Sequence, residues 1–122
     1  EIEYAASLLT VVGLSQKGNE PVYTLSGGEK RRVAIARALM QKPSILLADE
    51  ILSDLDFVQV NIIVKTIQQM QKEFALTVVM VEHDLCMVKE VGDRISLLHS
   101  GQIVSHIDKE NITESAMCGL FK

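Results

Sequence analysis

Two short apolar runs constrain the fold of this 122-residue chain more than any other feature. They are SILLA at residues 44–48 and LTVVMV at residues 76–81, and each is followed at once by acidic residues. Uninterrupted apolar runs of this length are typical of parallel strands that are covered on both faces. Because segments of helical composition alternate with these runs, the sequence predicts an α/β fold with a largely parallel sheet flanked by helices.

The remaining elements follow from periodicity and from helix breakers. Helices are predicted over residues 2–12, 28–41, 58–74 and 84–91, with Gly13 ending the first and Pro43 following the second. The stretch RISLLHSGQIVSHI predicts two strands around a Ser100-Gly101 turn. A final amphipathic helix is expected after Asp108, with Ile112, Ala116 and Leu120 on one side.

Composition and charge exclude several classes of protein. Hydrophobic residues make up 48% of the chain, yet its apolar runs are far too short to span a bilayer, so buried strands explain them better. A formal charge of −4 argues against a nucleic-acid partner, whose binding surface would be basic. Cys86 and Cys118 form no C-x-x-C pair, which suits a reducing compartment and gives no metal framework. The first residues do not resemble a secretion leader, so secretion of the protein is not indicated.

Residues 26–29, Ser-Gly-Gly-Glu, stand at the start of the second predicted helix. They match the capping box S-x-x-E, in which serine and glutamate satisfy free N–H groups. A capping box does not explain two consecutive glycines, which let a backbone approach a ligand closely. Nor does it explain the cations of Lys30-Arg31-Arg32 in a first turn that already carries partial positive charge. Together these features favour a phosphate site, with a solvated basic face as the alternative.

The first apolar run ends in two carboxylates, Asp49 and Glu50. Ligands of open α/β sheets bind at the carboxyl ends of the strands. One carboxylate there can hold Mg²⁺, and a second can orient or deprotonate a water molecule that attacks phosphorus. The alternative is a strand that ends in a solvated acidic loop. The pair therefore indicates phosphoryl-transfer chemistry without deciding it.

The second apolar run is followed by His83, which would reach the same sheet edge if the two strands are parallel. An imidazole can hydrogen-bond a transferring phosphoryl group, although a histidine at a strand end is more often only a polar terminus. His99 and His106 are not close in sequence to other candidate site residues, and both are expected on the surface or in the hairpin. The phosphate loop G-x-x-x-x-G-K-[ST] is missing, because Asn19 and Glu20 follow the correctly spaced glycines.

The motifs LSGGEKRRVAIARAL, ILLADE, SDLD and VEHD resemble the C-terminal part of an ATP-binding cassette (ABC) ATPase domain, from Ile2 to about residue 104. The resemblance implies part of a P-loop NTPase fold in three portions. Residues 1–42 would be a partial helical subdomain with the signature motif, 43–107 a core portion with the Walker B, D-loop and His-loop motifs, and 108–122 a C-terminal helix. Residues 33–50 are similar to bacterial importer ATPases, including phosphonate-type ones, while substrate and direction stay open.

The resemblance also implies roles for single residues. Asp49 would organise Mg²⁺, Glu50 would be the general base, and His83 would contact the γ-phosphate. The nucleotide-binding set would be Ser26, Gly27, Gly28 and Glu29, facing ATP held by the opposite copy, together with Asp54 and Asp56 of the loop that signals between copies. The cofactors implied are therefore ATP and Mg²⁺.

The implied function is ATP hydrolysis to ADP and phosphate, coupled to substrate translocation by an ABC transporter. The implied partners are a second ABC ATPase domain, which completes an ATP sandwich, and transmembrane permease subunits. Such a protein would be cytoplasmic and peripheral on the inner face of the membrane. Because the phosphate loop, the adenine-stacking aromatic and the glutamine loop are missing, we expect a fragment or truncated gene product that is inactive alone. A half that bears the phosphate loop would restore activity.

Four residues depart from the family pattern. Ile51 and Phe57 replace prolines, Asp54 replaces a small residue, and Glu82 replaces a frequent threonine. One alternative function is the C-terminal lobe of a chromosome-maintenance or DNA-repair ATPase, but no heptads of a coiled coil precede Tyr23. Another is a degenerate module without catalysis, which the departures favour and the intact acidic and histidine motifs oppose.

Overall fold

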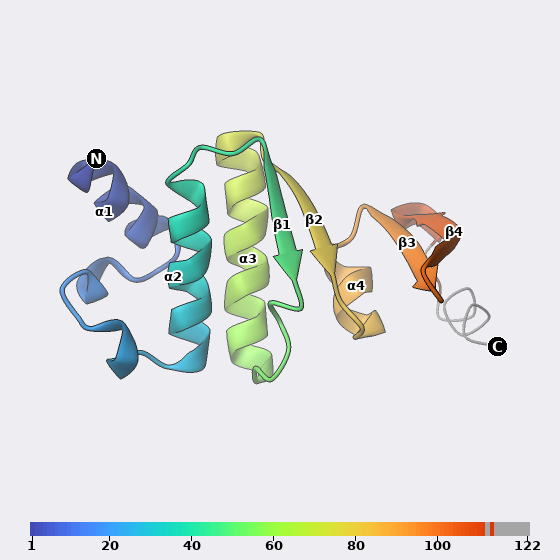
Figure 1. Cartoon of the computed structure of the whole chain (residues 1–122), viewed down its shortest axis with the longest axis horizontal. Coiled ribbons are helices and arrows are strands. Elements are labelled where there is room, and N and C mark those ends of the chain that lie inside the picture. The colour runs from blue at the N-terminus through green and yellow to red at the C-terminus, as the bar shows by residue number, and fades with distance from the viewer. Residues whose placement is uncertain (112, 114–122) are drawn as a thin grey trace. The chain divides into compact units, whose positions relative to one another are not determined.

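The computed structural model describes residues 1–111 and Thr113, and its chain divides into two compact units, residues 1–81 and 82–122 (Figure 1). The first unit contains the helices α1 (Ile2–Val11), α2 (Gly27–Leu39) and α3 (Phe57–Phe74) and the strands β1 (Ile45–Asp49) and β2 (Thr77–Val81). Two short 3₁₀ turns, Ser15–Lys17 and Val22–Thr24, connect α1 to α2. The predicted elements of this unit are all present, with ends shifted by one or two residues.

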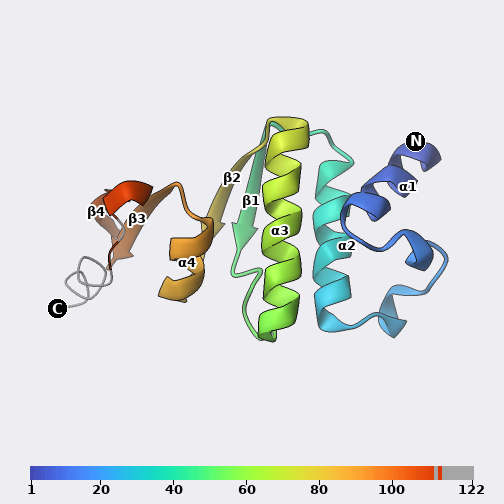
Figure 2. The same cartoon turned by 180° about the vertical axis from the view of Figure 1, so that it is seen from behind.

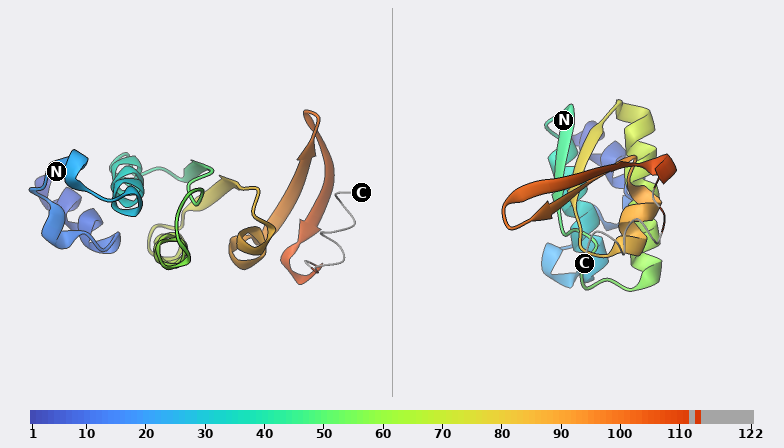
Figure 3. Two further views of the ribbon diagram at one scale, coloured as in Figure 1. Left: turned by 90° about the horizontal axis from the view of Figure 1, so that it is seen from below. Right: turned by 90° about the vertical axis from the view of Figure 1, so that its right-hand side faces the viewer.

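Strands β1 and β2 pair in parallel, with Ile45 opposite Thr77 and Asp49 opposite Val81. This confirms the prediction of an α/β fold with parallel strands. Helices α2 and α3 lie side by side and run opposite to the strands (Figures 1 and 2). Seen nearly end-on, the two helices form one layer beside the sheet (Figure 3, left). As a result, α2 and α3 begin at the end of the unit where β1 and β2 finish.

The core of the first unit lies where the helices meet one another and the sheet. Its most deeply buried side chains belong to α1, to the turn after α1 and to α3; they are Leu8, Val12, Ile63 and Met70. Strand β1 adds Leu46 and Ala48, which are also buried. Burial of these aliphatic groups is the main source of stability for a unit of this size.

The other face of the sheet is open to solvent. Its apolar side chains are Ile45, Leu47, Val79 and Val81, which are between 51% and 77% exposed. The prediction that these strands are covered on both faces is therefore wrong for the described chain. Its helical layer covers one face, and side chains alternate across a strand, so every second residue is left outside.

Local signals set the ends of α3. Helix α3 begins at Asp56, whose Oδ1 accepts a hydrogen bond from the Gln59 N–H at 2.9 Å. It ends at Ala75, which takes the left-handed conformation with φ of 49°. A left-handed residue at this position reverses the chain, so β2 can return along the helix that precedes it.

The second unit contains α4 (Leu85–Val91), β3 (Arg94–His99), β4 (Gln102–Asp108) and a 3₁₀ turn at Lys109–Asn111. Strands β3 and β4 form an antiparallel hairpin, and Ser100 and Gly101 at its turn both have positive φ, as a type I′ turn requires. The hairpin prediction is thereby confirmed, and His99 and His106 are exposed on it as expected. The helix predicted after Asp108 falls mostly on residues 112 and 114–122, outside the described part of the chain.

Among the residues that the structure describes, no helix has both the length and the apolar character needed to cross a membrane.

Candidate functional site

The candidate site lies at the end of the first unit where the strands finish and the helices begin (Figures 1 and 2). Predicted site residues at this end are Ser26, Gly27, Gly28 and Glu29 at the start of α2, Asp49 and Glu50 at the end of β1, and Asp54 and Asp56 before α3. They come from three separate stretches of sequence. Their common position follows from the antiparallel arrangement of helices and strands in the unit.

Ser26 and Glu29 form the capping box that the sequence predicts. The Ser26 N–H donates to Glu29 Oε2 at 2.8 Å, and the Glu29 N–H donates to Ser26 Oγ at 3.3 Å. The hydrogen bond from the Ser26 N–H, followed by the Ser26 side chain, lowers the pKa of the Glu29 carboxyl, and Lys17, whose Nζ lies 3.9 Å from Glu29 Oε1, adds to the effect. The box fixes the first turn of α2 and leaves the N–H groups of the two glycines for other acceptors.

The two glycines have different surroundings. A Cβ at Gly27 would meet nothing within 4 Å, and Gly27 is exposed. A Cβ at Gly28 would overlap Oε1 of Gln59, and Gly28 is buried. Gly28 therefore lets the Gln59 side chain of α3 lie directly against α2, while Gly27 leaves an open surface beside the helix start. Of the two, Gly27 fits the prediction of a backbone that a ligand can approach.

The three cations that follow do not form one anion site. Arg31 Nη1 donates to the backbone oxygen of Glu50 at 2.9 Å. Arg32 is 8% exposed, and its Nη1 lies 3.6 Å from the Cβ position of Gly13. Lys30 is exposed. This corrects the interpretation of the triplet as a joint phosphate site, because Arg31 is bonded to the Glu50 backbone and Arg32 is buried.

The Glu50 backbone is held on both sides. Its N–H donates to Val81 O at 2.9 Å, which extends the β1–β2 ladder by one residue. Its carbonyl oxygen accepts from Arg31 Nη1 and from Ser53 Oγ, each at 2.9 Å. Glu50 has φ of 47°, a left-handed conformation that costs a non-glycine residue about 1–2 kcal/mol. These hydrogen bonds therefore hold the Glu50 backbone in its left-handed conformation.

The two aspartates before α3 differ in their surroundings. Asp56 caps α3 through the Gln59 N–H, so it has a structural role in the helix start. Gln59 in turn packs on Gly28, and this contact joins the first turns of α2 and α3. Asp54 is exposed and left-handed, with φ of 58°, a conformation that aspartate tolerates better than most residues.

The carboxylates at the end of β1 fit a magnesium ion that is bound together with a nucleotide. Asp49 and Glu50 are adjacent and exposed. Among the described residues, no three side chains of His, Cys, Asp or Glu gather closely enough to hold a metal ion. A Mg²⁺ ion on a nucleotide needs only one or two carboxylates, since phosphate oxygens and water complete its shell. The strand end therefore suits a metal that arrives with its phosphates.

His83 follows β2 by two residues and is exposed. It belongs to the second unit, and its role stays a prediction. The neighbouring Asp84 caps α4, because its Oδ1 accepts from the N–H groups of Cys86 and Met87. Cys86 is a free, exposed thiol on this helix.

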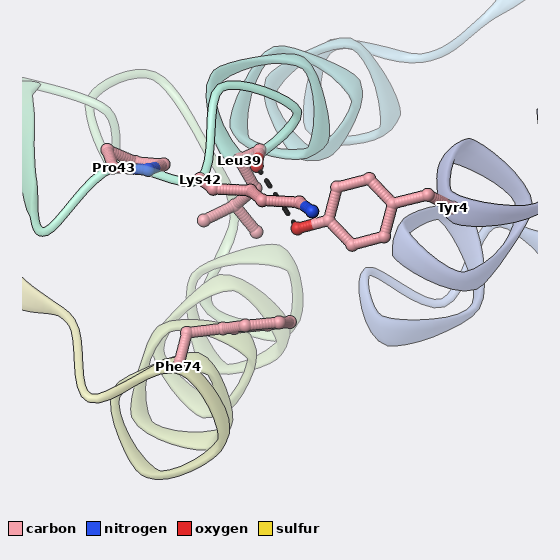
Figure 4. A pocket seen from close by; sticks show the side chains of 5 residues that line it. All are labelled: Tyr4, Leu39, Lys42, Pro43 and Phe74. Carbon is pink, nitrogen blue, oxygen red and sulfur yellow. Dashed lines mark hydrogen bonds between the residues drawn. The ribbon is translucent and has the colours of Figure 1, made fainter. Parts of the chain in front are cut away.

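A pocket of about 280 Å³ lies at the opposite ends of α2 and α3 (Figure 4). It is lined by Tyr4, Leu39, Lys42, Pro43 and Phe74. The Tyr4 hydroxyl donates to Leu39 O at 3.3 Å, and Lys42 Nζ lies 5.1 Å from the centre of the Tyr4 ring. Both polar groups thus have partners within the unit, and the remaining walls are largely apolar. The pocket is a poor phosphate site, which leaves the other end as the candidate.

Two contacts at the candidate site have no signal in the sequence. They are the hydrogen bond from Arg31 to Glu50 O, across 19 positions, and the packing of Gln59 on Gly28. Both depend on which way a long side chain turns after the elements have packed.

Comparisons with known proteins agree with the motifs. The ABC transporter family model matches residues 2–53. The methionine import ATP-binding protein MetN of Rhodospirillum rubrum is 41% identical over 99 residues, which cover 81% of this chain and 28% of that protein. The phosphonates import ATP-binding protein PhnC of Bdellovibrio bacteriovorus is 42% identical over 106 residues, covering 87% of this chain and 41% of that protein.

A solved structure shows the same fold. CbiO1 of Clostridium perfringens, part of the ABC transporter complex CbiONQ, matches with a TM-score of 0.84 and 29% identity. The match covers 89% of this chain and 43% of that one, so the chain spans less than half the length of the proteins it matches. The motifs, the parallel strands and these relatives agree, and the chain belongs to the ABC transporter family, with a fold that corresponds to part of an ABC ATPase domain.

Proposed function

We propose that this chain is the signature and Walker B part of the ATP-binding component of an ABC transporter. The reaction is hydrolysis of ATP to ADP and phosphate, coupled to movement of a substrate across a membrane. The single observation that supports this most is the gathering of the α2 start and the β1 carboxylates at one end of the first unit (Figure 1). Uptake is the favoured direction, because relatives of this chain are named as import proteins.

The start of α2 contacts the γ-phosphate of an ATP molecule that a second copy holds. Neither the Gly27 N–H nor the Gly28 N–H donates to another group in the described chain, as is usual in the first turn of a helix. Those donors, the exposed Ser26 side chain and the positive end of the helix dipole together attract a phosphate oxygen. Glu29 supports them by holding the Ser26 backbone in place.

The carboxylates at the end of β1 act on the nucleotide that is bound to the same copy. Asp49 holds Mg²⁺ directly or through water, and Glu50 accepts the proton of the attacking water. When it is bound, Mg²⁺ neutralises negative charge on the phosphates. Asp54 and Asp56 lie in the loop that meets the other copy, and His83 is assigned to the γ-phosphate on the resemblance of its motif alone. The partners are a second ATP-binding domain and a membrane permease, which hold the protein at the inner membrane face.

The remainder of an ATP-binding domain completes the site. The open face of the sheet, with Ile45, Leu47, Val79 and Val81, supports this, because parallel sheets are normally covered on both faces. A second support is the share of the relatives that the chain spans, between 28% and 41%. On this basis the chain alone has negligible turnover.

The test compares ATP hydrolysis by the 122-residue chain alone with hydrolysis after co-expression with the phosphate-loop part of a relative. We expect turnover only in the completed protein, measured as released phosphate. Glu50→Gln lowers kcat by about 10²–10⁴-fold, the usual contribution of a general base, and leaves nucleotide binding intact. Glu3→Gln, an exposed carboxylate on α1, is the matched control.

Three outcomes would count against the proposal. Robust hydrolysis by the chain alone, abolished by Glu50→Gln, would show that no second part is needed. A completed protein that binds no nucleotide would overturn the assignment altogether. Nucleotide binding without any hydrolysis would point instead to a module that has lost catalysis.

A further inference from the structure

We propose that Arg31 is a positioning residue for Glu50. Its hydrogen bond connects the Glu50 backbone to α2, the helix whose start faces the ATP molecule held by the other copy. The inference rests on the proposed function and adds a residue to it. Its basis is the hydrogen bond from Arg31 Nη1 to Glu50 O at 2.9 Å, between the second turn of α2 and the residue after β1.

The conformation of Glu50 needs such support. A left-handed glutamate is strained, and it persists where the surroundings hold its backbone. The Glu50 N–H is fixed by β2, through Val81 O, and the Glu50 carbonyl is fixed by Arg31 and by Ser53. The N–H bond belongs to the sheet and the Ser53 bond is local. The hydrogen bond from Arg31 connects Glu50 to α2.

Arginine suits this role because of its shape and charge. Its guanidinium stays charged at every relevant pH and makes a stronger hydrogen bond to a carbonyl than a neutral donor does. The Arg31 side chain is half-buried and lines a groove of about 150 Å³ between α2 and β1, beside Ala34, Leu46 and Ile51. Packing along this groove limits the rotamers of the side chain, so the guanidinium is already placed before a nucleotide binds.

The connection joins residues that serve two different nucleotides. Ser26 and Gly27 begin the helix on which Arg31 lies, and they face ATP held by the other copy. Glu50 acts on the nucleotide of its own copy. A shift of α2 that follows contact with the other copy's phosphate therefore moves the anchor of the Glu50 backbone. Errors of about 1 Å in the position of a catalytic group can cost about 100-fold in rate.

The experiment measures kcat and KM for ATP, and equilibrium binding of Mg-ATP, in the full-length protein that carries this sequence. Arg31→Met keeps the length and apolar stem of the side chain but removes its donors. We expect kcat to fall about tenfold or more, while KM and Mg-ATP binding change less than twofold. Arg31→Lys, which restores one charged donor, recovers most of kcat. Ser53→Ala removes another donor to the same carbonyl and lowers kcat as well.

Arg37→Met is the matched control, because Arg37 is an exposed arginine in the last turn of the same helix. It should leave kcat within twofold of the wild type. Wild-type kcat in Arg31→Met would overturn the inference and leave the proposed function standing, provided that Glu50→Gln is inactive. Parallel losses of kcat, Mg-ATP binding and melting temperature that Arg31→Lys does not restore would also overturn it, since they indicate a purely structural role. A wild-type protein without ATPase activity would overturn the proposed function and this inference together.

Discussion

The two faces of the β1–β2 sheet differ sharply in their surroundings. On the helix side, Leu46 is 8% exposed and Ala48 is 5% exposed, whereas on the other side Leu47 is 77% exposed. Both faces carry aliphatic side chains, and adjacent residues of one strand lie in opposite environments. The apolar residues of a strand therefore indicate which of its faces can be buried. Their exposure shows which of these faces the described chain itself covers.

The largest expected effect comes from a matched pair of substitutions on β1. Leu46→Ala should lower the free energy of unfolding of the 122-residue chain by about 2–5 kcal/mol, because it opens a cavity against the helices. Leu47→Ala should change it by about 0.5 kcal/mol or less, as exposed positions usually do. Urea unfolding followed by circular dichroism measures both. Equal costs would show that the open face is covered in solution, and sedimentation would then identify self-association.

A second pair of substitutions compares an exposed with a buried position within the helical layer. Gly28→Ala should be less stable than Gly27→Ala by about 1 kcal/mol, the low end of the usual cost of overpacking, because only the methyl group at position 28 meets Gln59, whose flexible side chain can shift. Both substitutions gain the same helix propensity, so their difference reports the contact with α3. Thermal unfolding of the two variants is the measurement. A double variant with Gln59→Ala should remove most of the difference, and its persistence would contradict the assigned contact.

The smallest effect is expected at the exposed start of α2, where the helical layer meets solvent. Because the folded state lowers the pKa of Glu29 below its ordinary value of 4.5, the charged form stabilises the fold above that pH. This contribution is lost as the pH falls through the folded-state pKa. The melting temperatures of the wild type and Glu29→Gln should therefore differ at neutral pH and converge once the pH falls below the folded-state pKa of Glu29. Glu3→Gln is the control, and curves that stay parallel throughout would contradict the prediction.

Local features of the fold could be predicted from the sequence because the residues that cause them are neighbours. Ser26 and Glu29 are three positions apart, and their capping box forms as the motif indicates. Ser100-Gly101 gives the hairpin turn for the same reason, and the apolar runs give parallel strands. In these cases the short-range chemistry and the final packing favour the same structure.

Contacts between distant residues could not be predicted in this way. The sequence gives no means of knowing that Arg31 reaches Glu50 or that Gln59 fills the space above Gly28. Both contacts arise after the helices have taken their places, and each side chain has several rotamers that fit its own helix. The open sheet face was also mispredicted, because an apolar run does not show whether the covering residues lie in the same chain. The roles of Asp49, Glu50 and His83 stay predictions that activity measurements must test.

The common direction of α2 and α3 has a consequence for how the first unit can change during evolution. The loops near Ser26 and Glu50 contain the candidate site residues. The loops at Lys42 and Ala75 lie at the opposite end of the unit and connect each helix to the strand that follows it. Substitutions or insertions on the far side are therefore expected to adjust folding without disturbing the proposed nucleotide contacts. Under the proposed function, exchanging residues 50–55 between relatives is expected to alter communication between copies, while Asp56 keeps its cap on α3.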